Sequence, residues 1–312
     1  MSEAEGANTV FMLMMLDPQV NGYAGVDFQQ DGLSGDDLLR AARAWRRDGG
    51  GQFFLTLITD EWARMTARLR RLRTLREPSG ELREIIAGWH VEGPFLSERP
   101  GFCGAHNPAL MIDPRADHLC ELRDLLGDDP TLVTLAPERP GAMKAIAQAR
   151  ALKIHVSLGH TDASAEQLRE AVAAGAEGFT HLGNGCPQQL DRHDNILWRV
   201  LDTPGLMIGL IADGLHVSPP LFRLIHRLVS PDRIYYTTDA MAAAGSPPGE
   251  YAIGRLRVVV GEDGVVRHPG QSNFAGSSLR PDQVEPRVRQ MLGLQAERLL
   301  PAVENNAIRW LT

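Results

Sequence analysis

The chain has 312 residues, of which 43% are hydrophobic, and its formal net charge is −7. This length and hydrophobic content suffice for one large core, and α/β barrels of this length commonly form a single domain. The acidic balance argues against nucleic acids and anionic membranes as partners, although it does not exclude a small anionic substrate.

The cysteines and the N-terminal region bear on the compartment. Cys103, Cys120 and Cys186 are odd in number and widely spaced, so no disulfide framework is expected. The apolar run Val10–Leu16 is too short to cross a bilayer, and the basic segment of a signal peptide does not precede it. We therefore expect a protein of a reducing compartment, the cytoplasm.

In chain order, apolar runs alternate with amphipathic stretches. The apolar runs end near Asp17, Thr59, Val91, Ala136, Ser157, His181, Ala212 and Asp239. Helical patterns lie between several of them, at Asp36–Arg47, Trp62–Arg76, Ala142–Ala151, Ala165–Ala174 and Pro220–Val229. Continuous apolar runs are typical of parallel strands that are buried on both faces. Eight such units favour a closed (β/α)₈ barrel over an open sheet.

Two segments interrupt this alternation. Ser97–Pro114 is a long loop after the third strand, and Tyr251–His268 has the pattern of a β-hairpin with its turn at Glu262-Asp263-Gly264. We expect residues 1–312 to form a single barrel domain with a hairpin excursion near residues 250–268.

Polar side chains gather where the apolar runs end. They are Gln19, Asn21, Glu92, His160, His181, Asp213, His216 and Asp239. In a barrel these strand ends meet at one face, where barrel active sites lie. Each residue alone has a structural explanation, since a lone histidine is more often hydrogen-bonded than a ligand and a lone aspartate can cap a helix. Together, one carboxylate and two imidazoles supply the ligands of a catalytic zinc-type site, and Asp239 adds a base.

Eight sequence blocks surround these polar residues and the turns between them. They are DPQVNGYAGVDFQ, HVEGPFLSERPGFCGAHNP, VTLAPE, VSLGHTDAS, FTHLGNGCP, IADGLHV, YYTTDAMAAAG and FAGSSL. With these blocks in the order of the family, the sequence resembles the N-acetylglucosamine-6-phosphate deacetylases of the amidohydrolase superfamily. The resemblance covers about Asp17 to Leu279, with a weaker match to about Ile308.

The resemblance implies a role for several residues of the reaction centre. Glu92, His160 and His181 match the metal ligands of the family, and Asp239 matches its catalytic aspartate. His106 matches the histidine that polarises the acetyl carbonyl. A metal ion lowers the pKa of a bound water molecule to about 7, and a carboxylate can carry a proton from that water to the leaving amine.

The resemblance also implies a set of substrate-binding residues. Asn184 and Gly185 fall where the family holds the sugar phosphate, and His216 matches a further substrate-binding histidine. Arg192 matches an arginine that binds the phosphate, in some members from the neighbouring subunit.

Gln19 and Asn21 bear on the number of metal ions. Many superfamily members have His-x-His at these positions and bind a second metal, whereas neutral amides are weaker ligands for zinc-type metals. We therefore expect one divalent ion, zinc first, with iron, cobalt or manganese as alternatives. The two amides could also simply satisfy hydrogen bonds at the strand end.

Three departures from the family affect the expected architecture and substrate. Only 16 residues precede Asp17, so we expect the small β-sandwich domain of the family to be largely absent. Gly183-Asn184-Gly185 stands where the family has Tyr-Asn-Ala, and His193-Asp194-Asn195 stands where it has Glu-Pro-Gly. Both changes lie on the phosphate side of the expected pocket.

These features leave three functional hypotheses. The first is hydrolysis of N-acetylglucosamine 6-phosphate to glucosamine 6-phosphate and acetate. The second is hydrolysis of another N-acyl sugar or amide at the same site, and the third is a non-catalytic relative that binds a sugar. Since Val10–Leu16 would be an exposed apolar patch beside the first strand, we also expect a partner subunit to cover it, in a homodimer.

Overall fold

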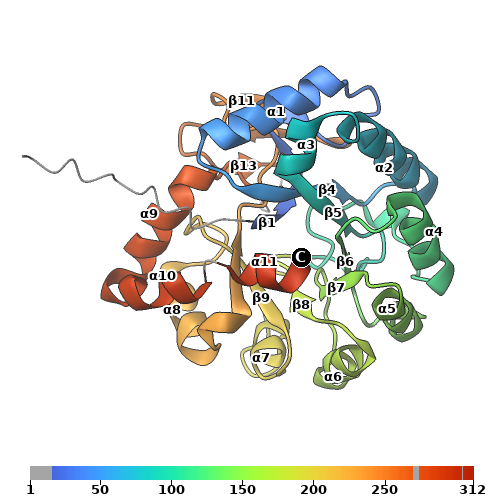
Figure 1. Ribbon diagram of the computed structural model, residues 1–312. Helices are drawn as coiled ribbons and strands as arrows, with labels where there is room; N and C mark the ends of the chain where they lie inside the picture. The colour runs from blue at the N-terminus through green and yellow to red at the C-terminus, as the bar shows by residue number, and fades with distance from the viewer. Residues whose placement is uncertain (1–15, 270–273, 304) are drawn as a thin grey trace, which may run out of the picture.

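The computed structural model describes residues 16–269, 274–303 and 305–312, and eight parallel strands form its central sheet (Figure 1). Neighbouring strands in the sheet are also consecutive along the chain, in the order β1-β4-β5-β6-β7-β8-β9-β10. These strands are β1 (Leu16–Val20), β4 (Gln52–Ile58), β5 (Ile86–Glu92), β6 (Thr131–Leu135), β7 (His155–Leu158), β8 (Gly178–Phe179), β9 (Met207–Ile211) and β10 (Ile234–Thr237).

Helices surround the strands on the outside, except that the last one, α11, lies across one end of the barrel (Figure 1). They are α1 (Gly35–Arg47), α2 (Trp62–Arg76), α3 (Gly80–Ile85), α4 (Ala116–Leu126), α5 (Ala142–Ala151), α6 (Ala165–Ala174), α7 (Ile196–Leu201), α8 (Pro219–Leu228), α9 (Pro281–Leu292), α10 (Ala296–Val303) and α11 (Asn306–Leu311). The five helices expected from the sequence are all present. Within the described ranges, none of the helices has the length and hydrophobicity needed to cross a bilayer.

The first and last strands meet and nearly close the sheet into a barrel. Val20 forms a parallel β-bridge with Ala240, and the backbone N–H of Asn21 donates to the carbonyl of Ala240 at 2.7 Å. Eight parallel strands, each followed by helical segments, confirm the predicted (β/α)₈ barrel. The run Val10–Leu16, on which the expected dimer contact depends, lies outside the described residues except for Leu16.

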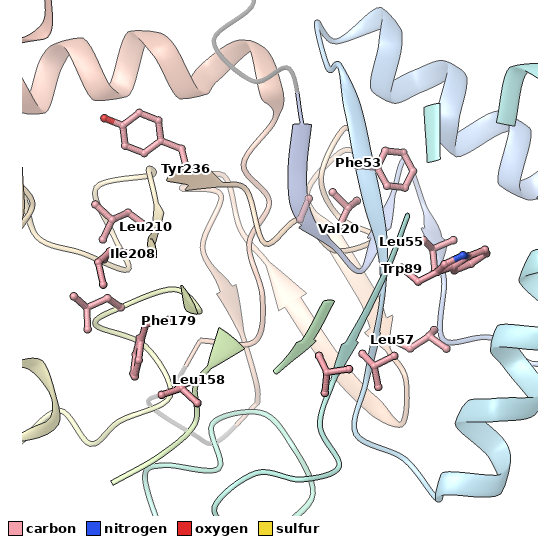
Figure 2. Packing of buried hydrophobic residues seen from close by; sticks show 14 of the residues in the cluster. Val20, Phe53, Leu55, Leu57, Trp89, Leu158, Phe179, Ile208, Leu210 and Tyr236 are labelled. Carbon is pink, nitrogen blue, oxygen red and sulfur yellow. The ribbon is translucent and has the colours of Figure 1, made fainter. Parts of the chain in front are cut away.

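The largest hydrophobic cluster joins the outer faces of the strands to the helices. Leu55 and Leu57 of β4 and Trp89 of β5 belong to it (Figure 2), together with Leu69 of α2. Successive side chains of a strand point to opposite faces. The residues between these apolar positions, such as Thr56 and His90, therefore point into the barrel.

The excursion after the last barrel strand differs from the predicted hairpin. It is a three-stranded antiparallel sheet of β11 (Gly249–Ile253), β12 (Leu256–Val260) and β13 (Val266–Arg267). The predicted turn at Glu262-Asp263-Gly264 joins β12 to β13. A tighter turn at Gly254-Arg255, where Gly254 has φ of 59°, joins β11 to β12. The sequence did not indicate this turn, because Gly-Arg is a weak turn signal.

The remaining elements are short. Two small strands after β1 pair with each other, and three single 3₁₀ turns complete the described structure. These are β2 (Gly22–Tyr23), β3 (Val26–Asp27), Pro108–Leu110, Pro231–Arg233 and Gly293–Gln295.

Candidate active site

Four of the predicted site residues lie at strand ends on one face of the barrel. Glu92 is the last residue of β5, whereas His160, His181 and Asp239 each lie two residues beyond β7, β8 and β10. These three have positive φ angles of 50°, 34° and 49°. They are three of the five non-glycine residues with positive φ in the described ranges. Such strained backbone is common where a side chain must be aimed at a functional site.

Three imidazoles converge on the carboxylate of Glu92. Its Oε1 lies 2.9 Å from Nε2 of His181 and 3.5 Å from Nε2 of His160. Its Oε2 lies 3.7 Å from Nε2 of His106, which is contributed by the long loop after β5. One possible ligand atom each from Glu92, His106 and His160 lies within 4.8 Å of the others. The geometry thus groups His106 with the predicted ligands Glu92 and His160, while His181 contacts the same carboxylate.

Hydrogen bonds on the far side of two rings fix their tautomers. Nδ1 of His160 donates to the carbonyl of Phe102 at 3.0 Å, so Nε2 is unprotonated when the ring is neutral. Nδ1 of His106 instead accepts from the backbone N–H of Thr59 at 3.4 Å and lies 2.8 Å from its hydroxyl. Because a backbone N–H can only donate, neutral His106 carries its proton on Nε2 and presents a donor to the site.

The donor set fits a divalent metal ion. Glu92 offers carboxylate oxygens, and His160 offers an unprotonated ring nitrogen that faces the carboxylate. Carboxylate oxygens and imidazole nitrogens are the ligand types of catalytic zinc-type sites. Nδ1 of His181 is buried and has no hydrogen-bond partner among the described residues. The proton of this ring is therefore free to move to Nδ1 and release Nε2 as a ligand.

Two glycines make room for the ring of His160. A Cβ atom at Gly185 would lie 2.7 Å from Nδ1 of His160, and one at Gly104 would lie 2.8 Å from its Cε1. Both glycines also have positive φ, of 58° and 57°. Residues from the loops after β5 and β8 thus pack against His160, and any larger side chain would displace it.

Asp239 is held by the side-chain amides of Gln19 and Asn21. Its Oδ1 accepts from Nε2 of Gln19 at 2.9 Å and from Nδ2 of Asn21 at 2.7 Å. Burial, and then the charge of Glu92, raises the pKa of Asp239 to about 8. The carboxyl group can therefore gain and lose a proton near neutral pH.

The other two acid–base groups of the centre have fixed protonation states near neutral pH. Burial alone would raise the pKa of Glu92, but its contacts with the imidazoles of His160 and His181 hold that pKa well below its usual range, so Glu92 stays ionised. Burial, and then the proximity of His160, lowers the pKa of His106 to about 3, so His106 stays neutral.

A cavity of about 400 Å³ opens above these residues. Asn184, Gly185 and His216, the predicted substrate-binding residues, line this cavity. Asp213 fixes the ring of His216, because its Oδ2 lies 2.6 Å from Nδ1 of His216. Arg192 is exposed, its Nε donates to His193 at 3.0 Å, and it is not one of the described residues that line the cavity.

A buried polar layer inside the barrel was not assigned from the sequence. Nε2 of His90 lies 2.8 Å from the hydroxyl of Thr134, which lies 2.8 Å from that of Thr180. Thr180 in turn donates to Ser157 at 2.8 Å. This layer links β5, β6, β7 and the end of β8 close to Glu92 and His181. The internal position of His90 on an apolar run was the available signal.

No family model matches the chain. An N-acetylglucosamine-6-phosphate deacetylase from Lysinibacillus sphaericus is 30% identical over 309 residues, which cover 99% of this chain and 78% of that protein. The chain belongs to the N-acetylglucosamine-6-phosphate deacetylase family.

Further relatives of this deacetylase family agree with that assignment. An N-acetylgalactosamine-6-phosphate deacetylase from Escherichia coli O157:H7 is 33% identical over 279 residues, covering 89% of this chain and 71% of that protein. A mutant of the Mycobacterium smegmatis deacetylase, solved in complex with N-acetyl-D-glucosamine-6-phosphate, superimposes with a TM-score of 0.85 at 33% identity. That match covers 96% of this chain and 77% of the mycobacterial chain.

Proposed function

We propose that the protein hydrolyses the N-acetyl amide of N-acetylglucosamine 6-phosphate, giving glucosamine 6-phosphate and acetate. The observation that carries the proposal is the grouping of Glu92, three imidazoles and Asp239 around one cavity in a member of this deacetylase family. A protein that only binds a sugar has no need for a buried carboxyl group that titrates near neutral pH.

In this proposal Glu92, His160 and His181 hold one divalent metal ion, with zinc expected first. Such an ion supplies Lewis acidity, which polarises oxygen atoms and favours deprotonation of water near neutral pH. The unprotonated Nε2 of His160 supports this choice of ligands, and so does Nδ1 of His181, which has no hydrogen-bond partner among the described residues. Gln19 and Asn21 direct amide nitrogens at Asp239, and nitrogen donors of this kind do not bind a second cation.

Asp239 acts as the base and then as the acid. The oxygen of a water molecule adds to the acetyl carbon, and Asp239 takes one proton from that water. The C–N bond then breaks as Asp239 gives the proton to the nitrogen, which would otherwise be a poor leaving group. The remaining proton of the new acetic acid is lost to solvent or to the amine, so that acetate and the sugar amine result.

His106 donates to the acetyl carbonyl oxygen. The hydrogen bond from the backbone N–H of Thr59 keeps the proton of the neutral ring on Nε2, which faces the reaction centre. Removal of one such donor to a developing oxyanion typically costs about a hundredfold or more in rate.

Asn184, Gly185 and His216 bind the phosphorylated sugar within the cavity that they line. Arg192 is exposed and outside that cavity, so we place its guanidinium on the phosphate bound by a second copy of the chain. This requires a homodimer, and it agrees with the position of Arg192 outside the set of described residues that line the cavity of its own chain. Because none of the three described cysteines forms a disulfide, we further propose the reducing cytoplasm as the compartment.

A deacetylation screen tests this function. The metal-loaded protein is incubated with N-acetylglucosamine, its 6-phosphate and the C4 epimer N-acetylgalactosamine 6-phosphate, and acetate release is measured. We expect the highest kcat/KM for N-acetylglucosamine 6-phosphate. Equal values for the phosphorylated and unphosphorylated sugars would remove the phosphate assignment, and no acetate from any of them would remove the proposed reaction.

A further inference from the structure

Asn21 has a buried polar atom that lacks a hydrogen-bond partner within the described ranges. It directly follows β1 and is 1% exposed. Its Nδ2 donates to Oδ1 of Asp239 at 2.7 Å, so its own Oδ1 points away from that carboxylate. This Oδ1 atom is buried and accepts no hydrogen bond from any residue in the described part of the chain. Because burying an unpaired acceptor costs free energy, such an atom in a native protein calls for a physical reason.

The position of this oxygen is well defined. The backbone N–H of Asn21 donates to Ala240 at 2.7 Å, and its carbonyl accepts from the N–H of Phe28 at 3.1 Å. In the base form of the reaction centre Asp239 is ionised, and rotating the amide by 180° would then place its oxygen against that carboxylate, which repels it. Asn21 lines the same cavity as Asp239 and His181. A molecule bound in the cavity can therefore supply the missing donor.

The scissile amide has a donor suited to this position. In the proposed reaction Asp239 gives its proton to the amide nitrogen, so that nitrogen lies within reach of Asp239 and of its neighbour Asn21. A secondary amide is trans, so its N–H points away from its carbonyl oxygen. With the carbonyl directed at His106, the N–H points away from His106 and is available to the Asp239 side of the cavity.

We infer that Oδ1 of Asn21 accepts a hydrogen bond from the nitrogen of the scissile N-acetyl group, an inference that rests on the proposed function. The contact orients the amide for attack. It persists as the C–N bond breaks, because the leaving amine retains N–H groups. Asn21 is thereby a substrate-contacting residue that favours amides over esters, whose bridging oxygen has no hydrogen to donate.

Gln19 provides a matched control within the chain. It donates to the same oxygen of Asp239 at 2.9 Å and is 2% exposed, but it is not among the described residues that line the cavity. Gln19→Met and Asn21→Leu each remove one donor to Asp239 with little change in side-chain size. Only Asn21→Leu also removes the acceptor that faces the cavity.

The experiment measures kcat/KM on two substrates for the wild type and both variants. One substrate is N-acetylglucosamine 6-phosphate, and the other is the 2-O-acetyl ester of methyl glucoside 6-phosphate, in which oxygen replaces the N–H. We expect Gln19→Met to lower both values by the same factor. Asn21→Leu is expected to lower the amide value about tenfold more than the ester value, the scale of one lost hydrogen bond. If Asn21→Leu does not fold, Asn21→Ala takes its place in the comparison.

Equal losses on the amide and the ester for the Asn21 variants would overturn the inference and leave the proposed function intact. Two metal equivalents in the wild type, with one lost in Asn21→Leu, would also overturn it, because Oδ1 would then be a metal ligand. No turnover of the amide by the metal-loaded wild type would instead remove the proposed function and this contact together.

Discussion

The carboxylate of Asp17 on the first barrel strand binds Thr238 beyond the last one. Its Oδ2 accepts from the backbone N–H of Thr238 at 2.9 Å and from its hydroxyl at 2.6 Å, while Oδ1 accepts from the hydroxyl of Thr237 at 2.5 Å. Asp239 is the next residue along the chain. Asp17 therefore joins the first and last strands of the barrel and fixes the segment that carries Asp239, the proposed catalytic carboxylate.

Removal of these hydrogen bonds to Asp17 should both destabilise the fold and reduce activity. Asp17→Ala leaves buried threonine hydroxyls and a backbone N–H unpaired, which we expect to cost about 2–4 kcal/mol in the free energy of unfolding. Denaturant titration of the wild type and the variant measures this cost. An Asp17→Ala protein with wild-type stability and wild-type kcat would show that the junction between the first and last strands does not depend on this residue.

The raised pKa of Asp239 predicts how the stability of the metal-free protein changes with pH. Its folded pKa of about 8 lies above the ordinary value of 3.8, so the folded state holds the proton more tightly. The resulting stability is fully present below about pH 4 and is lost as pH rises through about 8.

The difference in Tm between the metal-free wild type and Asp239→Asn isolates this effect, because other buried groups such as Asp17 and His90 titrate in both proteins. We expect the Tm of the wild type to fall relative to that of Asp239→Asn as the pH rises from about 4 to about 8. A difference that stays constant across this range would show that Asp239 has an ordinary pKa in the folded protein.

Gly185 predicts a specific effect on metal binding. In Gly185→Ala the new Cβ would lie 2.7 Å from Nδ1 of His160, so the ring must move. We expect metal affinity to fall at least about tenfold, as it does when groups supporting a metal ligand are changed. Gly183→Ala is the control, because Gly183 also has positive φ but its Cβ would meet Val217 at 3.3 Å. Similar affinities in both variants would argue against His160 as a ligand.

The grouping of these residues could be predicted because they mark the ends of apolar runs. A barrel brings strand ends together, so Glu92, His160, His181 and Asp239 could be assigned to one face without coordinates. The resemblance added His106, which belongs to a loop.

Contacts between distant segments could not be predicted in this way. The packing of Gly104 and Gly185 on His160 joins two loops, and no local pattern in either loop indicates it. The position of Arg192 outside its own cavity likewise depends on the path of an irregular segment between β8 and α7.

The placement of Arg192 at a partner's site predicts complementation between two variants. We expect Arg192→Ala to lower the preference for the phosphorylated sugar by about tenfold to a hundredfold, the value of a charge-assisted hydrogen bond. Mixed dimers of Arg192→Ala and Asp239→Asn should regain that preference, because one site then combines an intact Asp239 with an intact partner arginine. Mixed dimers that resemble Arg192→Ala alone would place the arginine at the site of its own subunit.

Acetate release from N-acetylglucosamine 6-phosphate by the metal-loaded wild type and by Asp239→Asn tests the central proposal most directly. Asparagine has nearly the same shape but cannot carry the proton, so we expect kcat to fall by about three orders of magnitude while one metal equivalent is retained. An Asp239→Asn protein that keeps most of the wild-type kcat would contradict the proposed role of Asp239 as base and acid.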